Sequence, residues 1–204
     1  MDSATSDPPP GAPEQHLPPS VARSVKVLVV GAFGVGKTTF IRSVSEIAPL
    51  STEERITTAS VGVDPDVPSK STTTVAMDFG RITVTEDIAL YLFGTPGQRR
   101  FWDLWAGLAE GAVGALVMVD TRDLEPSFEV LDQLELRTRV PFAIVVNRFP
   151  GSPDHPLERV REALDVLPET PVVSCDVRDA SSAVQALVTL VEHAIARASE
   201  PVPA

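Results

Sequence analysis

The residues best suited to chemistry form a short glycine-rich segment. Residues 31–38 read GAFGVGKT and match the pattern G-x-x-x-x-G-K-[S/T]. The glycines permit a tight turn that aims backbone N–H groups at one point, where the start of a following helix also favours an anion. Lys37 can place a charge between two phosphates, and the Thr38 hydroxyl is a hard oxygen ligand of the kind that Mg²⁺ prefers. We therefore expect this loop to bind nucleotide phosphates with Mg²⁺ through Gly34, Val35, Gly36, Lys37, Thr38 and Thr39.

The elements that flank this loop have the order that a phosphate site needs. Residues 25–30 (VKVLVV) are an apolar, β-branched run typical of a buried strand, and residues 37–47 have the pattern of a helix. This strand-loop-helix context favours a phosphate loop over the alternative, a glycine-rich turn that carries a surface lysine.

Strands and helices alternate over the rest of the chain. Residues 48–71 contain three prolines and are expected to form a long loop. Further strands are expected at 73–84, 88–93, 114–120, 142–147 and 171–174, and helices at 98–110, 125–139, 155–167 and 181–198. This alternation predicts an α/β fold, a mixed six-stranded sheet with one antiparallel strand and helices on both faces.

The ends of the chain differ from its middle in composition. Residues 1–22 are rich in proline and are expected to be a disordered tail, either a docking segment for a partner or a solvated extension. One domain is expected over residues 23–199, and residues 200–204 would be a short C-terminal tail.

Charge and cysteine content exclude several classes of function. The formal net charge of −11 argues against nucleic acid and anionic membranes as partners. Cys175 is the only cysteine, so an internal disulfide is impossible, which fits a reducing compartment. Membrane-spanning, signal and prenylation patterns are not evident. We expect a cytoplasmic protein without direct membrane insertion.

Four further motifs follow the glycine-rich loop in a fixed order. They are TTTVAMDFG at 72–80, FGTPGQRRFW at 93–102, VVNRF at 145–149 and VSCD at 173–176. The series resembles the ordered motifs of the Ras-like small GTPases, which are P-loop NTPases, over about residues 24–198. Its wording is similar to that of the conservon-encoded GTPases of bacteria, relatives of the MglA polarity switch.

This resemblance implies a molecular switch that binds GTP and GDP with Mg²⁺ and hydrolyses GTP slowly. Thr74, with Thr73 as the alternative, would join Thr38 at Mg²⁺ and sense the γ phosphate. Gly97 would donate its N–H to the γ phosphate, and Gln98 would orient the attacking water. The implied catalytic residues are Gln98, Lys37 and Thr74.

The resemblance also implies a base site and partners. Asn147 and Arg148 would hold the guanine base, and Ser174 and Cys175 would supply backbone contacts to its edge. A Roadblock-type regulatory protein is the implied partner. A sensor-kinase-like membrane protein would recruit the chain to the inner face of the membrane.

Three positions depart from the pattern of the family. Gly94 stands where an aspartate usually anchors Mg²⁺ through water, so that another carboxylate such as Asp78 would have to replace it. Phe33 stands where a small glycine is usual and would crowd the γ phosphate and an incoming arginine finger. Pro150 replaces the carboxylate that usually reads guanine, for which Asp154 or Asp176 could substitute.

These departures keep two other functions open. One is a pseudo-GTPase that acts as a docking module with weak or no hydrolysis and relaxed base specificity. The other is a P-loop kinase or ATPase, which the GTPase-like motif order disfavours.

Overall fold

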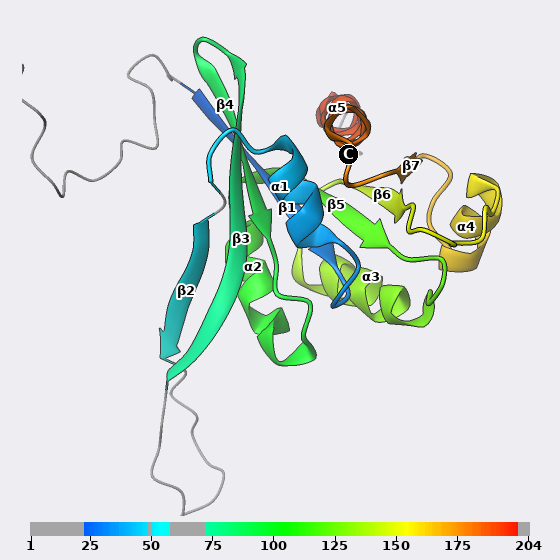
Figure 1. Cartoon of the computed structure of the whole chain (residues 1–204), viewed down its shortest axis with the longest axis horizontal. Coiled ribbons are helices and arrows are strands. Elements are labelled where there is room, and N and C mark those ends of the chain that lie inside the picture. Colours follow the sequence, from blue (N-terminus) through cyan, green and yellow to red (C-terminus); the bar gives the residue numbers. More distant parts are fainter. Residues whose placement is uncertain (1–22, 49, 58–71, 200–204) are drawn as a thin grey trace, which may run out of the picture.

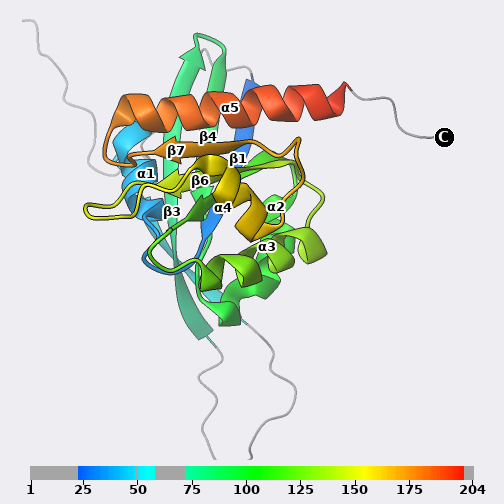
Figure 2. The same cartoon turned by 90° about the vertical axis from the view of Figure 1, so that its right-hand side faces the viewer.

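The computed structural model describes residues 23–48, 50–57 and 72–199, and all structural statements refer to these residues. They form one seven-stranded sheet with helices on both faces (Figures 1 and 2). The strands are β1 (Arg23–Gly31), β2 (Leu50–Thr57), β3 (Thr72–Thr85), β4 (Ile88–Gly94), β5 (Ala112–Val119), β6 (Phe142–Asn147) and β7 (Val172–Cys175). The helices are α1 (Lys37–Val44), the 3₁₀-helix η1 (Arg99–Leu104), α2 (Trp105–Ala109), α3 (Glu125–Arg137), α4 (Leu157–Leu164) and α5 (Ala180–Ala198).

The strand order β2-β3-β4-β1-β5-β6-β7 contains one strand that runs against the others. β3 is antiparallel to both β2 and β4, whereas β1, β4, β5, β6 and β7 are paired in parallel. Parallel neighbours end at the same edge, so the carboxyl ends of these five strands share one rim of the sheet. The loop at 31–36 leaves β1 at this rim.

The strand count of six was wrong by one, because β2 lies inside the segment that was expected to be a loop. Residues 50–57 pair with β3 in antiparallel register, from Leu50 opposite Phe79 to Thr57 opposite Thr72. The polar sequence LSTEERIT lacks an apolar alternation, so its extended form follows from pairing with β3 rather than from a pattern of its own. The rest of that segment, residues 58–71, lies outside the described residues, as do the two expected tails.

Two apolar clusters, one on each face, hold the sheet between its helices. Val27 and Val29 of β1 pack with α1 and α5, while Leu28 and Val30 pack with the face that α2, α3 and α4 cover. This alternation follows from the two-residue period of a strand. A strand that is buried on both faces reads as a continuous apolar run, as β1 does.

The helices differ from their expected extents, most clearly at 98–110 and 155–167. The segment expected as one helix at 98–110 divides into η1 and α2. α4 begins after Pro156 and ends at Leu164, where Asp165 caps it with a positive φ of 52°. In the described part of the chain, the search for a helix of sufficient length and apolarity to cross a membrane finds none.

Candidate functional site

The glycine-rich loop adopts backbone conformations that side chains resist. Gly34 and Gly36 have φ angles of 80° and 107°, in the region that favours glycine. A Cβ atom on Gly36 would also lie 2.6 Å from Nδ2 of Asn147. Gly36 must therefore be a glycine, because both its backbone conformation and its closeness to Asn147 exclude a side chain.

Lys37 is directed into the loop that precedes it. Its Nζ donates hydrogen bonds to the carbonyl oxygens of Gly31 and Ala32, at 2.8 and 2.7 Å. Burial lowers the pKa of Lys37 to about 8, against the opposing effect of the negative charge of Asp78. The ammonium group is thus held, largely desolvated, at the point where the loop would receive an anion.

Thr38 and Asp78 bring a hydroxyl and a carboxylate together at the start of α1. The Oγ1 atom of Thr38 donates a 2.5 Å hydrogen bond to Oδ2 of Asp78. Asp78 lies opposite Gly94 in the β3–β4 register, and a Cβ on Gly94 would lie 3.0 Å from Cβ of Asp78 and 2.9 Å from Cδ1 of Ile41. The Asp78 side chain can therefore lie where it does only because position 94 has no side chain.

This pair fits a Mg²⁺ ion that also binds phosphate. Because the Thr38 hydroxyl donates its proton to Asp78, its lone pairs remain for a hard cation. Among the described residues, no group of three or more His, Cys, Asp or Glu side chains could hold a metal. A cation at Thr38 would therefore depend on oxygen atoms of a ligand and of water.

Gly97 joins the segment after β4 to the phosphate loop. A Cβ at this position would lie 2.8 Å from the carbonyl carbon of Ala32 and from the nitrogen of Phe33. Gln98 follows immediately and is exposed. The structure thus brings Gly97 into direct contact with the loop and leaves Gln98 accessible beside it.

Three further sequence-predicted residues differ in how much of them the structure describes. Phe33 has 82% of its surface exposed, so that its ring projects from the loop into solvent. Thr73 and Thr74 lie in β3, paired with Ile56 and Arg55 of β2, but their side chains lie outside what the structure describes. The expected role of Thr74 at Mg²⁺ stays a prediction.

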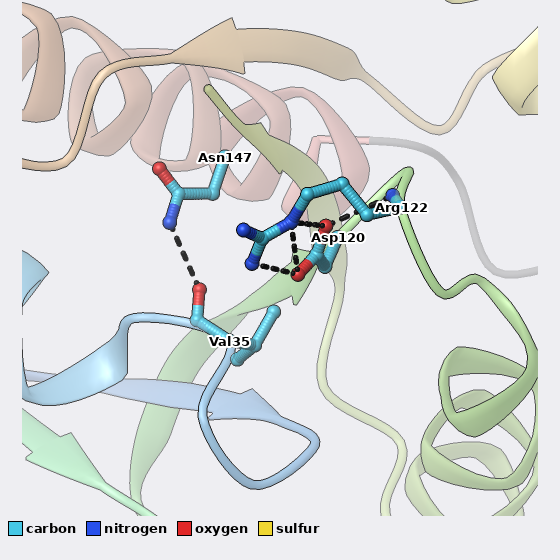
Figure 3. A network of polar contacts seen from close by, with 4 residues as sticks. All are labelled: Val35, Asp120, Arg122 and Asn147. Atoms are coloured by element: carbon cyan, nitrogen blue, oxygen red, sulfur yellow. Dashed lines mark hydrogen bonds and ion pairs between the residues drawn. The ribbon is translucent and has the colours of Figure 1, made fainter. Parts of the chain in front are cut away.

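Asn147, at the end of β6, braces the phosphate loop from the other side. Its Nδ2 donates a 3.0 Å hydrogen bond to the carbonyl oxygen of Val35, as Figure 3 shows. The residue is 1% exposed, and its Oδ1 has no hydrogen-bond partner. A buried amide oxygen without a partner is unfavourable, and a donor on a ligand would relieve that cost.

Ser174 and Cys175 accept hydrogen bonds from Arg148. The Nε atom of Arg148 donates to Oγ of Ser174 at 2.5 Å, and its backbone N–H donates to the carbonyl of Cys175 at 2.8 Å. The following turn lies close to the loop, because Cγ2 of Val177 lies 3.4 Å from the position of a Cβ on Gly36. The expected contacts of Ser174 and Cys175 with the edge of the base stay a prediction.

Sequence reasoning also missed two aspartate–arginine pairs at the same rim. Asp120 pairs with Arg122 after β5, and Asp176 pairs with Arg178 after β7. The hydrogen bonds from Arg178 lower the pKa of Asp176 to about 2. The Asp-x-Arg spacing could have indicated both pairs, because a strand-end aspartate often bonds the backbone two residues later.

Comparisons with other proteins agree with this geometry. A family described as "Conserved hypothetical ATP binding protein" matches residues 29–197. An uncharacterized protein of Methanocaldococcus jannaschii is 30% identical over 125 residues, which is 61% of this chain and 70% of that protein.

Solved structures show the same fold. The G domain of the T. maritima FeoB iron transporter has a TM-score of 0.53 at 18% identity, and the match covers 87% of this chain and 100% of that one. The cytosolic domain of that transporter, in its apo form, has a TM-score of 0.55 at 18% identity, over 88% of this chain and 66% of that one. The expected fold class, a P-loop NTPase of the small-GTPase kind, is confirmed.

Proposed function

The chain belongs to the family of conserved hypothetical ATP-binding proteins, and we propose that it works as a nucleotide-dependent switch that binds GTP and hydrolyses it slowly. The observation that carries this proposal is the contact between Gly97 and the backbone of the phosphate loop. A γ phosphate in the loop would lie at this junction, so its presence or loss would be transmitted to Gly97 and to η1 behind it.

Mg²⁺ would be held by Thr38, with Asp78 as its supporting carboxylate and with Thr74 as a further ligand. When bound, the ion would neutralise phosphate charge. Asp78 supports this assignment because it already accepts the Thr38 proton and occupies the space that Gly94 leaves free. Lys37 would supply the second positive charge to the phosphates.

Slow hydrolysis is supported by the two residues that border the γ-phosphate position. Gln98 would orient the attacking water from its exposed place beside Gly97. The ring of Phe33 is exposed on the loop, and it would obstruct an arginine finger that a partner inserted there. We therefore propose that hydrolysis is slow and that a partner does not accelerate it by this route.

A narrower place within the small GTPases is proposed from the residue sequences of the motifs. TTTVAMDFG, FGTPGQRRFW and VVNRF support a place among the conservon-encoded, MglA-related GTPases. A Roadblock-type regulator, a sensor-kinase-like membrane protein and a cytoplasmic location with recruitment to the membrane are proposed on the same basis.

A docking module with weak or no hydrolysis is the second candidate. Pro150 favours it, because a proline side chain cannot accept the hydrogen bonds by which a carboxylate would select guanine. The description of the family names ATP rather than GTP, which also leaves the base open.

The test is to denature the purified protein and to identify the released nucleotide by chromatography. GDP or GTP supports the proposed switch. Absence of any nucleotide favours the docking module, and ADP or ATP favours an adenine-specific NTPase and contradicts the assignment of GTP.

A further inference from the structure

Two aspartate–arginine pairs at the rim of the site share one geometry. After β7, Oδ1 of Asp176 accepts the backbone N–H and Nε of Arg178, and Oδ2 accepts its second terminal nitrogen, at 3.0, 2.8 and 2.7 Å. After β5, Asp120 accepts the same three groups of Arg122, at 2.9, 2.9 and 2.6 Å. Figure 3 shows the Asp120–Arg122 pair close to Asn147. In each pair, several bonds to one carboxylate fix the plane of the guanidinium.

The two guanidinium groups differ in what covers their flat faces. Arg122 lies 3.7 Å from the centre of the Phe149 ring. The side chain of Arg178 is 56% exposed, and the structure records no aromatic ring over it within the described residues. Guanidinium groups stack on aromatic faces. The Arg122 guanidinium of the first pair, which we call the closed pair, is already covered by an aromatic ring. The Arg178 guanidinium of the second, which we call the open pair, has a face free to stack on a ligand.

The turn that carries the open pair adjoins the phosphate loop through Val177. Val177, between Asp176 and Arg178, lies beside the positions of Gly36 and Asn147. Asn147 independently indicates that a hydrogen-bond donor of a ligand binds here, because the residue is 1% exposed and its Oδ1 has no hydrogen-bond partner.

We propose that Arg178, held flat by Asp176, is the stacking surface for the nucleobase, and that the site binds guanine and adenine with similar affinity. This proposal rests on the proposed nucleotide site and adds how the base is held. Stacking on a flat cation uses the face of the base, which every purine has, and not its hydrogen-bonding edge.

Neither carboxylate considered as a substitute at Pro150 can read guanine in the usual way. A carboxylate has about four acceptor positions, and Arg178 takes three of those on Asp176, so the N1–H and N2–H pair of guanine cannot both be accepted. The side chain of Asp154 is 91% exposed and lies 3.7 Å from Arg148. The structure therefore offers an open stacking face at Arg178, while neither of these two carboxylates is both free and fixed.

Calorimetric titration of the intact chain with Mg²⁺ tests this assignment, with GDP, ADP and pyrophosphate as three separate ligands. Arg178→Ala is expected to weaken GDP and ADP about tenfold each, equivalent to about 1.4 kcal/mol, and to leave pyrophosphate unchanged. Asp176→Asn, which frees the guanidinium without removing it, is expected to weaken both nucleotides by a smaller factor. Arg122→Ala, in the closed pair, is the matched control and should leave all three affinities unchanged.

Other outcomes overturn the proposal in recognisable ways. A loss for GDP alone would mean that Arg178 acts through the edge of guanine. An equal loss for pyrophosphate would mean that it acts on the phosphates, and no loss at all would remove it from the site. A wild-type protein that binds none of the three ligands overturns the proposed nucleotide site itself, and the stacking surface with it.

Discussion

The phosphate end and the base end of the site are built in different ways. At the phosphate end, the residues at 31–38 are contiguous, and Lys37 bonds carbonyl groups of its own loop. At the base end, Asn147 is the last residue of β6 and Arg178 lies beyond the end of β7, so that separate strand ends must meet. The phosphate end is therefore specified by local sequence, whereas the base end depends on the packing of the sheet.

Because of this difference, we expect the two ends to contribute differently to nucleotide affinity and to discrimination between bases. The loop, the buried lysine and the Thr38–Asp78 pair are the groups that we propose for phosphate and Mg²⁺. The base end has a brace at Asn147 and an open guanidinium at Arg178 but a proline in place of the guanine-reading carboxylate. We expect most of the binding free energy to come from the phosphate end and little discrimination to come from the base end.

The largest expected effect follows from removal of the buried ammonium group at the phosphate end. Lys37→Ala should lower the affinity for GDP by about two orders of magnitude, because charge-assisted bonds to phosphate in a desolvated site contribute a few kcal/mol. Equilibrium dialysis with Mg²⁺ measures this loss. Lys26→Ala, which removes a lysine that bonds the carbonyl of Glu110 instead, is the control. An unchanged affinity in Lys37→Ala would mean that the binding free energy comes mainly from the base end.

The second prediction concerns the coupling of positions 94 and 78. Gly94→Asp introduces the aspartate that the resemblance to Ras-like GTPases leads one to expect at this position, but its Cβ would press on Asp78 and Ile41. We expect a loss of about 1–3 kcal/mol in the free energy of unfolding, the usual cost of overpacking. The double variant Gly94→Asp with Asp78→Gly should recover most of it, and chemical denaturation of all four proteins gives the coupling. Additive losses would show that the two positions are independent.

A smaller effect is expected at the mouth of the phosphate end. On the proposal that the Phe33 ring, which is exposed in this structure, would crowd a bound γ phosphate, Phe33→Ala should raise the single-turnover rate of GTP hydrolysis several-fold. Phe128→Ala removes another exposed phenylalanine, on α3 and away from the loop, and should leave the rate unchanged. A wild-type rate that is already fast would refute the crowding argument.

The smallest effect concerns the reactivity of the Cys175 thiol at the end of β7. Burial raises the pKa of the Cys175 thiol above its usual value of 9.0, so the thiolate is scarcer in the folded than in the unfolded protein. Cys175 is also 1% exposed. At pH 8 a thiol reagent should react slowly with the native protein and rapidly after denaturation, as absorbance shows. Equal rates would indicate that the β7 end opens readily.

How much the sequence predicted follows the same division. The contiguous motif identified Lys37 and Thr38, and the apolar runs located most strands and helices. The extended form of residues 50–57 was missed because a polar edge strand depends on its partner β3. The closeness of Asp78 to Gly94 depends on strand register, which a single sequence does not fix.

The base end was the least predictable part. Asn147 was identified from its motif, and its brace to Val35 agrees with that assignment. The closeness of Val177 to Gly36 joins residues far apart in the chain, so only the tertiary structure could show it.

The most direct test of the central claim is whether the intact, folded protein takes up a nucleotide in the presence of Mg²⁺. A radiolabelled nucleoside triphosphate should be retained on a filter by the wild type and displaced by an excess of unlabelled pyrophosphate, because the phosphate end carries most of the affinity. Failure of the folded wild type to retain any labelled guanine or adenine triphosphate would contradict the account.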